Sequence, residues 1–266
     1  MLTAANAPKY VFEGEIKRDI AYGELPSQKL DIYLPAQLSD ASNALRLPVV
    51  VFFHGGRWTT GNKGQYEFVG MRLADLGYIA VIPNTRLYPQ VKFPTFIEDS
   101  AQAIAWVDDN IADYQGSNDL FVLGHSSGAH MGAMVVANQA YLAAFDKTPD
   151  IINAFAGMAG PYDFEPEAPE LKDMFGPPSN YPNMQVTTFI DGSEPPMLLI
   201  YTENDSTVHI RNLELLKAGI EKANGRVETI IYDSGGHTAT VGAFSWANPS
   251  GLPVAADVDT FFRAHL

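Results

Sequence analysis

The sequence predicts an α/β fold in which helices cover both faces of a mostly parallel sheet. Continuous apolar runs such as VVVFF at residues 49–53 are typical of strands that are buried on both faces. Between these runs, apolar residues recur at the i, i+4, i+7 spacing of one helical face, as at Val69, Leu73 and Leu76. Alternation of buried strands with helices is the pattern of parallel strands that are joined by crossover helices.

The first two predicted strands differ from the later ones. Residues 15–20 and 29–34 alternate polar and apolar side chains, which indicates strands with one solvated face. We expect these two strands to form an antiparallel edge of the sheet. Residues 35–47 are small and polar, so we expect a surface loop there, before the first buried strand begins.

The remaining elements alternate to the end of the chain. Buried strands are predicted at residues 78–82, 120–123, 151–158, 197–201 and 227–232. Helices are predicted at residues 69–76, 97–111, 127–140, 208–223 and 254–261. Residues 161–195 break the rhythm because they are rich in Pro and aromatic residues. We interpret them as a lid or pocket wall that belongs to one α/β domain spanning residues 1–266, since so short a stretch cannot build its own core.

The composition excludes several classes of protein. The 266 residues are 46% apolar and 18% charged, which is typical of a globular chain and not of a disordered or collagen-like one. Without cysteine there are no disulfides, no thiolate metal sites and no cysteine nucleophile. With 17 basic and 31 acidic residues the net charge is −14, which disfavours nucleic acid, polyanionic substrates and anionic membranes as partners.

Targeting signals are not evident in the sequence. No apolar run approaches the roughly 18 residues that cross a bilayer. Residues 1–10 hold no basic region followed by an apolar stretch, so we expect no signal peptide in the given chain. An export segment lying before this start would leave no trace here, so the compartment stays open. Nothing in the sequence distinguishes a monomer from a homodimer.

The strongest chemical signal lies between the strand at 120–123 and the helix at 127–140. Gly124-His125-Ser126-Ser127-Gly128 fits the pattern G-x-S-x-G at a strand-to-helix turn. A sharp turn needs small flanking residues and exposes the central serine at the carboxyl end of the strand. The helix that follows presents free N–H groups. Ser126 is the predicted nucleophile, and the alternative is a glycine-rich turn without a catalytic role.

A second glycine-rich turn follows the buried strand at 49–53. His54-Gly55-Gly56-Arg57-Trp58 places paired glycines where the backbone can approach a substrate and direct N–H groups at it. We expect His54 to fix this loop by hydrogen bonding and not to act as a base. A tight turn without function is the alternative.

A hydroxyl nucleophile needs a base, and His237 is the predicted one. It lies in Ser234-Gly235-Gly236-His237, just past the last predicted strand, where active-site loops of such sheets gather. His125 adjoins the serine, but we expect its side chain to point elsewhere. The other histidines of the chain are His54, His130, His209 and His265.

The base in turn needs an orienting acid, and Asp205 is the preferred candidate. It follows the predicted strand at 197–201, and Ser206 and Thr207 come next as plausible helix starters. Glu203 is the nearby rival, and an N-cap carboxylate is the structural alternative for Asp205. More remote acids are Asp163, Asp191 and Asp233. The resulting chain order is nucleophile, acid, base.

These motifs together resemble the α/β-hydrolase superfamily, near its small hormone-sensitive-lipase-like and arylformamidase (kynurenine formamidase) esterases. The segments that carry the resemblance are LDIYLP at 30–35, HGGRW at 54–58, GHSSGAH at 124–130, ENDSTV at 203–208 and GGH at 235–237. The resemblance extends over nearly the whole chain, residues 29–262. It implies hydrolysis of carboxylic esters, with Ser126, Asp205 and His237 as nucleophile, acid and base.

The resemblance also implies an oxyanion hole formed by backbone at Gly55, Gly56 and Ser127. HGGRW departs from the HGGG of many lipase-like esterases and is closer to arylformamidases and to some feruloyl or acetyl-xylan esterases. We also expect the given chain to lack the long N-terminal cap of the lipase-like group. These departures bear on substrate size and subfamily and not on the chemistry.

The predicted substrate pocket is apolar and open enough for short acyl groups. Aromatic side chains that can shape it are Trp58, Tyr88, Tyr162, Phe164, Phe175 and Tyr181, with ordinary packing as the alternative for each. The preferred function is a carboxylesterase acting on small esters with short acyl, aryl or plant-polymer acyl groups. The alternatives are an arylformamidase that cleaves N-formyl-kynurenine and a non-catalytic binding module with the same fold. The chemistry requires neither a metal nor a cofactor.

Overall fold

The structure is a computed structural model that describes residues 5–6, 11–38 and 45–266. The predicted absence of a signal peptide concerns residues 1–10, most of which lie outside the described ranges. Residues 39–44 of the surface loop predicted at 35–47 also lie outside the described ranges.

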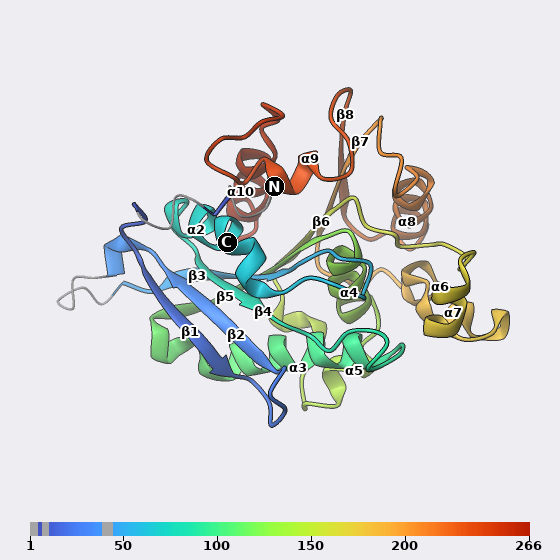
Figure 1. The fold of residues 1–266 in the computed structure, drawn as a ribbon, viewed down its shortest axis with the longest axis horizontal. Coiled ribbons are helices and arrows are strands. Elements are labelled where there is room, and N and C mark those ends of the chain that lie inside the picture. Colours follow the sequence, from blue (N-terminus) through green and yellow to red (C-terminus); the bar gives the residue numbers. More distant parts are fainter. Residues whose placement is uncertain (1–4, 7–10, 39–44) are drawn as a thin grey trace.

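One eight-stranded sheet runs through the described chain (Figure 1). Its strands stand in the order β1-β2-β4-β3-β5-β6-β7-β8. They are β1 (Glu15–Ala21), β2 (Lys29–Leu34), β3 (Leu47–Phe53), β4 (Ile79–Pro83), β5 (Gly116–His125), β6 (Ala154–Met158), β7 (Met197–Thr202) and β8 (Val227–Tyr232). Both pairings of β2 are antiparallel, and the pairings from β4 to β8 are parallel. This arrangement confirms the predicted mostly parallel sheet with an antiparallel edge.

Two strands begin three or more residues away from the predicted position. The apolar run that marks the core of β5 begins at Leu120, but the strand begins at Gly116, because Leu47 of β3 pairs with Gly116. Conversely, β6 begins at Ala154 and not at residue 151, because residues 149–151 form a 3₁₀ turn that opens with Pro149. Backbone pairing partners and proline therefore set these boundaries, and apolar character does not.

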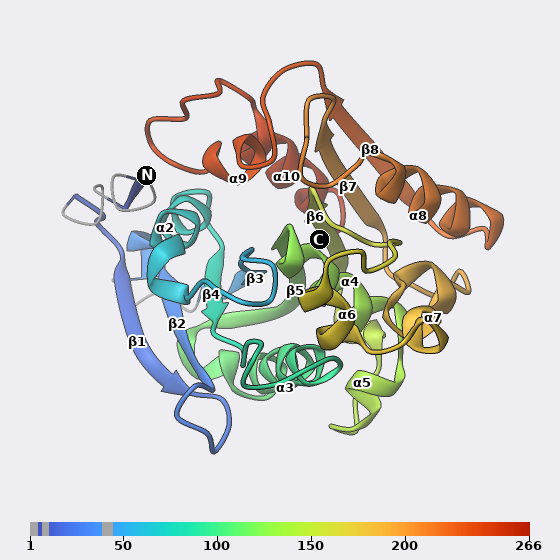
Figure 2. The same cartoon turned by 45° about the vertical axis from the view of Figure 1, so that its right-hand side comes forward.

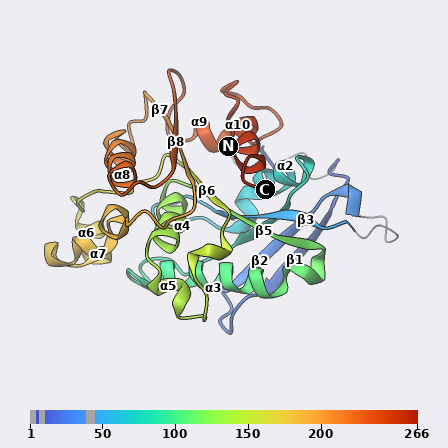
Figure 3. The ribbon, with the colours of Figure 1, turned by 180° about the vertical axis from the view of Figure 1, so that it is seen from behind.

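Helices cover both faces of the sheet, as expected from the alternating pattern (Figure 3). They are α2 (Glu67–Asp75), α3 (Thr95–Asn110), α4 (Ser127–Ala137), α5 (Ala140–Ala143), α6 (Pro169–Phe175), α7 (Tyr181–Met184), α8 (Arg211–Lys222), α9 (Ala239–Gly242) and α10 (Val254–Arg263). One buried cluster joins α3, α4 and α8 to one face of the sheet. A second buried cluster joins α2 and α10 to the opposite face. No helix in the described parts of the chain is long and apolar enough to cross a bilayer.

The parallel strands bring distant chain segments to one edge of the sheet. Strand β6 lies between β5 and β7, and β8 is next to β7. All four strands run in the same direction, so their carboxyl ends share an edge. Ser126, Asp205 and His237 all follow these ends. Residues 161–195 leave the sheet after β6 and return at β7, and their helices α6 and α7 lie beside α4 (Figure 2).

Candidate active site

Ser126 lies at the sharp turn between β5 and α4. Its backbone adopts a left-handed φ of 54°, which is strained for a residue with a side chain. The Ser126 N–H donates to the carbonyl of Met158 at 2.8 Å and ties the turn to β6. A Cβ atom at Gly128 would lie 2.1 Å from the Phe53 carbonyl oxygen, and one at Gly124 would collide with the backbone of α4. The G-x-S-x-G spacing therefore follows from the close approach of strands and helix at this turn.

The side chain of His237 joins two residues from the other strand ends. Its Nε2 lies 2.8 Å from the Oγ of Ser126. Its Nδ1 lies 2.8 Å from Oδ2 of Asp205. The His237 side chain is 15% exposed and that of Asp205 only 1%. A serine hydroxyl, an imidazole and a buried carboxylate thus form one hydrogen-bonded chain that reaches solvent at the imidazole.

Asp205 is held as an ionised acceptor. Its Oδ1 accepts the backbone N–H groups of Thr207 and Val208 at 2.8 and 2.9 Å. Burial opposes ionisation, but the hydrogen bonds from His237 and from these two amides outweigh it, and the pKa of Asp205 is lowered. A carboxylate that stays charged orients the His237 ring with its Nδ1 proton toward Oδ2.

The rival acids lie in other surroundings. Glu203 is exposed, and its backbone N–H pairs with the carbonyl of Tyr232. Asp163 accepts the hydroxyl of Thr187, and the exposed Asp191 accepts the N–H of Ser193 at 2.9 Å. Of these acids and Asp205, the structure brings Asp205 to the ring of His237.

The turn with the two glycines expected to form an oxyanion hole passes beside the serine. A Cβ atom at Gly55 would lie 3.1 Å from the Cβ of Ser126, so the loop backbone passes directly against the serine. Gly56 has a φ of 139°, and a Cβ atom there would lie 2.0 Å from the carbonyl oxygen of Thr60. Ser127 is the first residue of α4, where helical N–H groups have no intrahelical acceptor. Gly55 and Ser127 therefore lie next to Ser126, and Gly56 follows Gly55 in the same turn.

His54 contacts its own loop, as the sequence indicated. Its Nδ1 lies 2.9 Å from the carbonyl oxygen of Gly55, and its ring stacks on Tyr66 with the centroids 5.4 Å apart. Burial lowers the pKa of His54. The ring is therefore neutral at ordinary pH, and it contacts the Gly55 carbonyl and the Tyr66 ring.

The aromatic residues predicted to line a pocket divide into two groups. Tyr88 is half-buried, and its hydroxyl donates to Asp173 of α6 at 2.9 Å. Phe164 is also half-buried and stacks on Trp58 at 5.7 Å between ring centroids. Trp58 itself is 4% exposed and also packs against Phe175 at 5.0 Å. Tyr88 and Phe164 keep some accessible surface, whereas Trp58 is a packing residue.

The prediction for Tyr162 needs correction. Its side chain is fully buried, and Cβ atoms at Gly157 and Gly160 would collide with the Tyr162 ring or hydroxyl. Two glycines therefore make room for a tyrosine inside the core, out of reach of a substrate. Phe175 and Tyr181 are likewise buried. The sequence left packing open as the alternative for each of these residues, because an aromatic in a Pro-rich segment suits a pocket wall and a packed cluster equally well.

One contact at the site was not foreseen. His125 was expected to point elsewhere, but its Nε2 lies 3.1 Å from the carbonyl oxygen of His237. The sequence held no signal for this contact, because the G-x-S-x-G pattern leaves the residue at position 125 free and does not specify what its side chain contacts.

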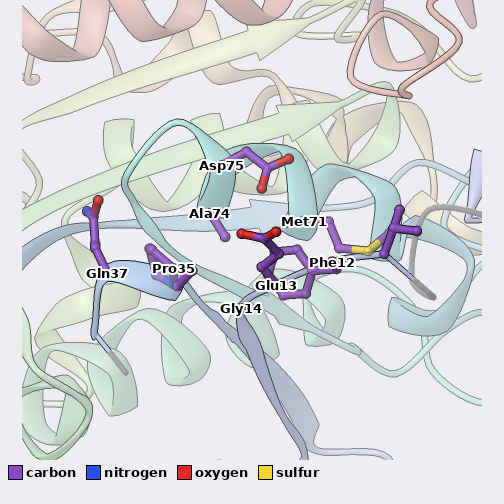
Figure 4. Close-up of a pocket in the computed structure, with 10 residues that line it drawn as sticks. Phe12, Glu13, Gly14, Pro35, Gln37, Met71, Ala74 and Asp75 are labelled. Carbon is purple, nitrogen blue, oxygen red and sulfur yellow. The ribbon is translucent and has the colours of Figure 1, made fainter. Parts of the chain in front are cut away.

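A cavity at the other edge of the sheet is separate from these residues. Figure 4 shows side chains that line it, among them Phe12, Glu13, Pro35, Met71 and Asp75. The cavity has a volume of about 320 Å³. Asp75 ends α2 just before β4 begins, so the cavity lies at the amino edge of the parallel strands, away from Ser126. No group of three or more His, Asp or Glu residues suited to a metal ion occurs among the described residues.

Known proteins that are similar to this chain include named esterases. The BD-FAE family model matches residues 30–220. The isoprenylcysteine α-carbonyl methylesterase ICME of Arabidopsis thaliana is 26% identical over 260 residues, which cover 87% of this chain and 58% of that protein. The kynurenine formamidase of Danio rerio is 31% identical over 148 residues, which cover 56% of this chain and 47% of that protein.

Solved structures show the same fold. Esterase B of Lactobacillus rhamnosis superposes with a TM-score of 0.81 at 20% identity, over 99% of this chain and 90% of that one. The chain spans between 30% and 59% of the length of the curated relatives it matches.

Proposed function

Since the chain belongs to the BD-FAE family, we propose that it is a serine hydrolase that cleaves carboxylic esters through an acyl-enzyme. The observation that carries the proposal is the position of one imidazole. The ring of His237 reaches the Ser126 hydroxyl and the Asp205 carboxylate, each at 2.8 Å. Such an arrangement activates a hydroxyl that is otherwise a weak nucleophile.

The proposed reaction uses each group in turn. His237 Nε2 takes the proton of Ser126 as the serine oxygen attacks the acyl carbon, and Asp205 stabilises the imidazolium that forms. Backbone N–H groups at Gly55, Gly56 and Ser127 would bind the oxyanion, each contributing about 10²–10³ in rate. The imidazolium then protonates the leaving alcohol, and water hydrolyses the acyl-enzyme with the same base.

The proposed substrates are small esters with short acyl groups, including aryl and plant-polymer acyl esters. Trp58, Tyr162 and Phe175 are buried by their own packing, so they do not offer a long aromatic tunnel to the acyl chain. The half-buried Tyr88 and Phe164 lie beside α6 and Trp58. Residues 161–195 would therefore form a wall of a shallow pocket and not a separate domain.

The test is the hydrolysis of p-nitrophenyl acetate and butyrate by the wild type and by Ser126→Ala. We expect the variant to lose about 10⁴–10⁶ in kcat. Ser100→Ala is the matched control, because its hydroxyl bonds within α3 to the Phe96 carbonyl at 2.8 Å, away from the site. Retained turnover in Ser126→Ala would refute Ser126 as the nucleophile.

A formamidase is the second candidate, because of the 31% identity to a kynurenine formamidase. The same serine and base can cleave an N-formyl amide, so the two functions differ in substrate preference and not in machinery. Comparing kcat/KM for N-formyl-kynurenine and for phenyl acetate separates them. A preference for the formamide would replace the esterase proposal.

A further inference from the structure

The residue directly before the proposed nucleophile contacts the loop that carries the proposed base. His125 is the last residue of β5, and His237 lies in the loop that follows β8. Its Nε2 lies 3.1 Å from the backbone carbonyl oxygen of His237. The two imidazole rings are 5.0 Å apart at their centroids and inclined by 43°.

The proton positions of His125 follow from this partner. A carbonyl oxygen only accepts, so Nε2 must carry the hydrogen and donate it. His125 is 3% exposed, and burial together with His237 lowers the pKa of His125 to about 3. The ring therefore stays neutral, with a bare Nδ1. A neutral ring also suits a place next to His237, which becomes positively charged in each catalytic cycle.

The same ring touches the third loop of the site. A Cβ atom at Gly55 would lie 2.8 Å from the Nδ1 of His125, so the Gly55 backbone rests against this edge of the ring. His125 Nδ1 has no hydrogen-bond partner in the part of the chain that the structure describes. One buried side chain is thus in contact with the loop of Gly55 and with that of His237, and it directly precedes Ser126.

The loop of His237 needs such an anchor. Gly235 and Gly236 precede the base, and Gly235 has a φ of 89°, a conformation that favours glycine. Besides His125, the His237 carbonyl has the hydroxyl of Thr240 at 3.4 Å, which is at the limit of a hydrogen bond. The shorter contact, and the one from outside the loop, comes from His125.

We propose that His125 is a positioning residue, which holds the His237 loop so that the imidazole of His237 stays in reach of Ser126. The inference rests on the proposed hydrolase function for its kinetic consequences. In this proposal the residue at the first variable position of the G-x-S-x-G motif links the turn of the nucleophile to the loop of the base.

Two substitutions separate positioning from bulk packing. His125→Phe keeps a ring of similar size but removes the donor. His125→Gln keeps a donor, because a glutamine amide nitrogen can reach the place of Nε2. We expect His125→Phe to lower kcat about 10²-fold while KM changes little, as for a small displacement of a catalytic group. His125→Gln should recover most of that loss.

Two kinetic outcomes would overturn the proposal. One is a kcat of His125→Phe equal to that of the wild type. The other is a loss in His125→Gln as large as in His125→Phe, which would mean that the ring only fills space. A wild type that hydrolyses no ester would instead contradict the proposed function.

Proton NMR tests the inference independently of substrate. The low-field resonance of the His237 Nδ1 proton, shared with Asp205, should persist in His125→Gln and vanish or shift in His125→Phe. If His125→Phe does not fold, the tautomer of His125 in the wild type decides. Nitrogen-15 shifts must show Nε2 protonated, and a proton on Nδ1 would refute the positioning role.

Discussion

Two neighbouring regions of the molecule are held together by different forces. The loops of the proposed catalytic residues, called the catalytic loops here, are residues 124–128, 203–208 and 233–238. They meet through hydrogen bonds of 2.8–3.1 Å that join His237 to Asp205, Ser126 and His125. The aromatic cluster next to them is held by ring packing over centroid distances of 5.0–6.2 Å. Its members are Trp58, Phe93, Phe96, His130, Phe164 and Phe175.

The difference shows how one loop can serve both regions. Trp58 lies three residues after Gly55, and its ring is buried in the aromatic cluster. Packing therefore anchors one end of the loop whose glycines approach Ser126. Hydrogen bonds are directional, so they determine the orientation of the side chains and the positions of their protons. Close packing of rings determines the position of the backbone that carries them. We expect substitutions in the catalytic loops to change rates, and those in the aromatic cluster to change stability.

Asp205→Asn should give the largest effect of the comparison. The amide keeps the shape but loses the charge and favours the wrong tautomer of His237, so we expect kcat to fall about 10⁴-fold. Steady-state assays of p-nitrophenyl acetate hydrolysis measure this loss. Glu203→Gln is the matched control, since Glu203 is exposed and two residues away. A larger loss at Glu203 would move the acid to that position.

Phe175→Ala should mainly affect stability. Phe175 is 1% exposed and packs against Trp58, Phe93 and Phe164, so its truncation leaves a cavity. We expect the free energy of unfolding to fall by about 3–5 kcal/mol, as measured by urea denaturation. Trp246→Ala, at a side chain that is 71% exposed, should change it by about 0.5 kcal/mol or less. Equal losses in both variants would contradict the packing argument.

Acid should destabilise the fold through its buried histidines. Burial lowers the pKa of His130 to about 4 from an ordinary 6.5, so below pH 6.5 the unfolded chain binds a proton that the folded chain does not. Stability is therefore lost as the pH falls from 6.5 to about 4, by about 1.4 kcal/mol per pH unit for each such residue. His125 and His54 act in the same direction.

His130→Gln isolates one of these protons. A glutamine can still donate to the Met184 carbonyl, which His130 contacts at 2.8 Å. Below pH 6.5 the free energy of unfolding of the variant should fall less steeply with pH than that of the wild type. The difference in slope should correspond to about one proton fewer taken up on unfolding. Urea midpoints at pH 7, 6 and 5 measure the slope. Parallel curves for the two proteins would show that His130 is not kept neutral.

Tyr162→Phe should give the smallest effect. The Tyr162 hydroxyl is buried without a hydrogen-bond partner in the described chain, so its removal should leave stability unchanged or raise it by about 1 kcal/mol. Tyr201→Phe is the contrast, because the buried Tyr201 hydroxyl donates to the Gly160 carbonyl. We expect that variant to lose about 1 kcal/mol. A raised KM in Tyr162→Phe would restore the substrate role that burial contradicts.

The sequence determined the layered fold because its signals are local. Buried strands appear in the sequence as apolar runs, and helices appear as apolar residues at helical spacing. These patterns predicted the fold class, the order of the strands along the chain and the position of the G-x-S-x-G turn. The strand ends that were missed, at Gly116 and at residue 151, depended on pairing partners and on Pro149. The approach of Ser126, Asp205 and His237 could be expected because parallel strands share one carboxyl edge.

Only the tertiary structure decided what each aromatic ring and each spare histidine contacts. Tyr162 became a core residue because Gly157 and Gly160 leave room for it, and Trp58 because Phe96, Phe164 and Phe175 surround it. His125 bonds to a carbonyl that is 112 residues away. Such contacts depend on which segments fold against one another. The chemical type of a side chain does not by itself determine which residues surround it.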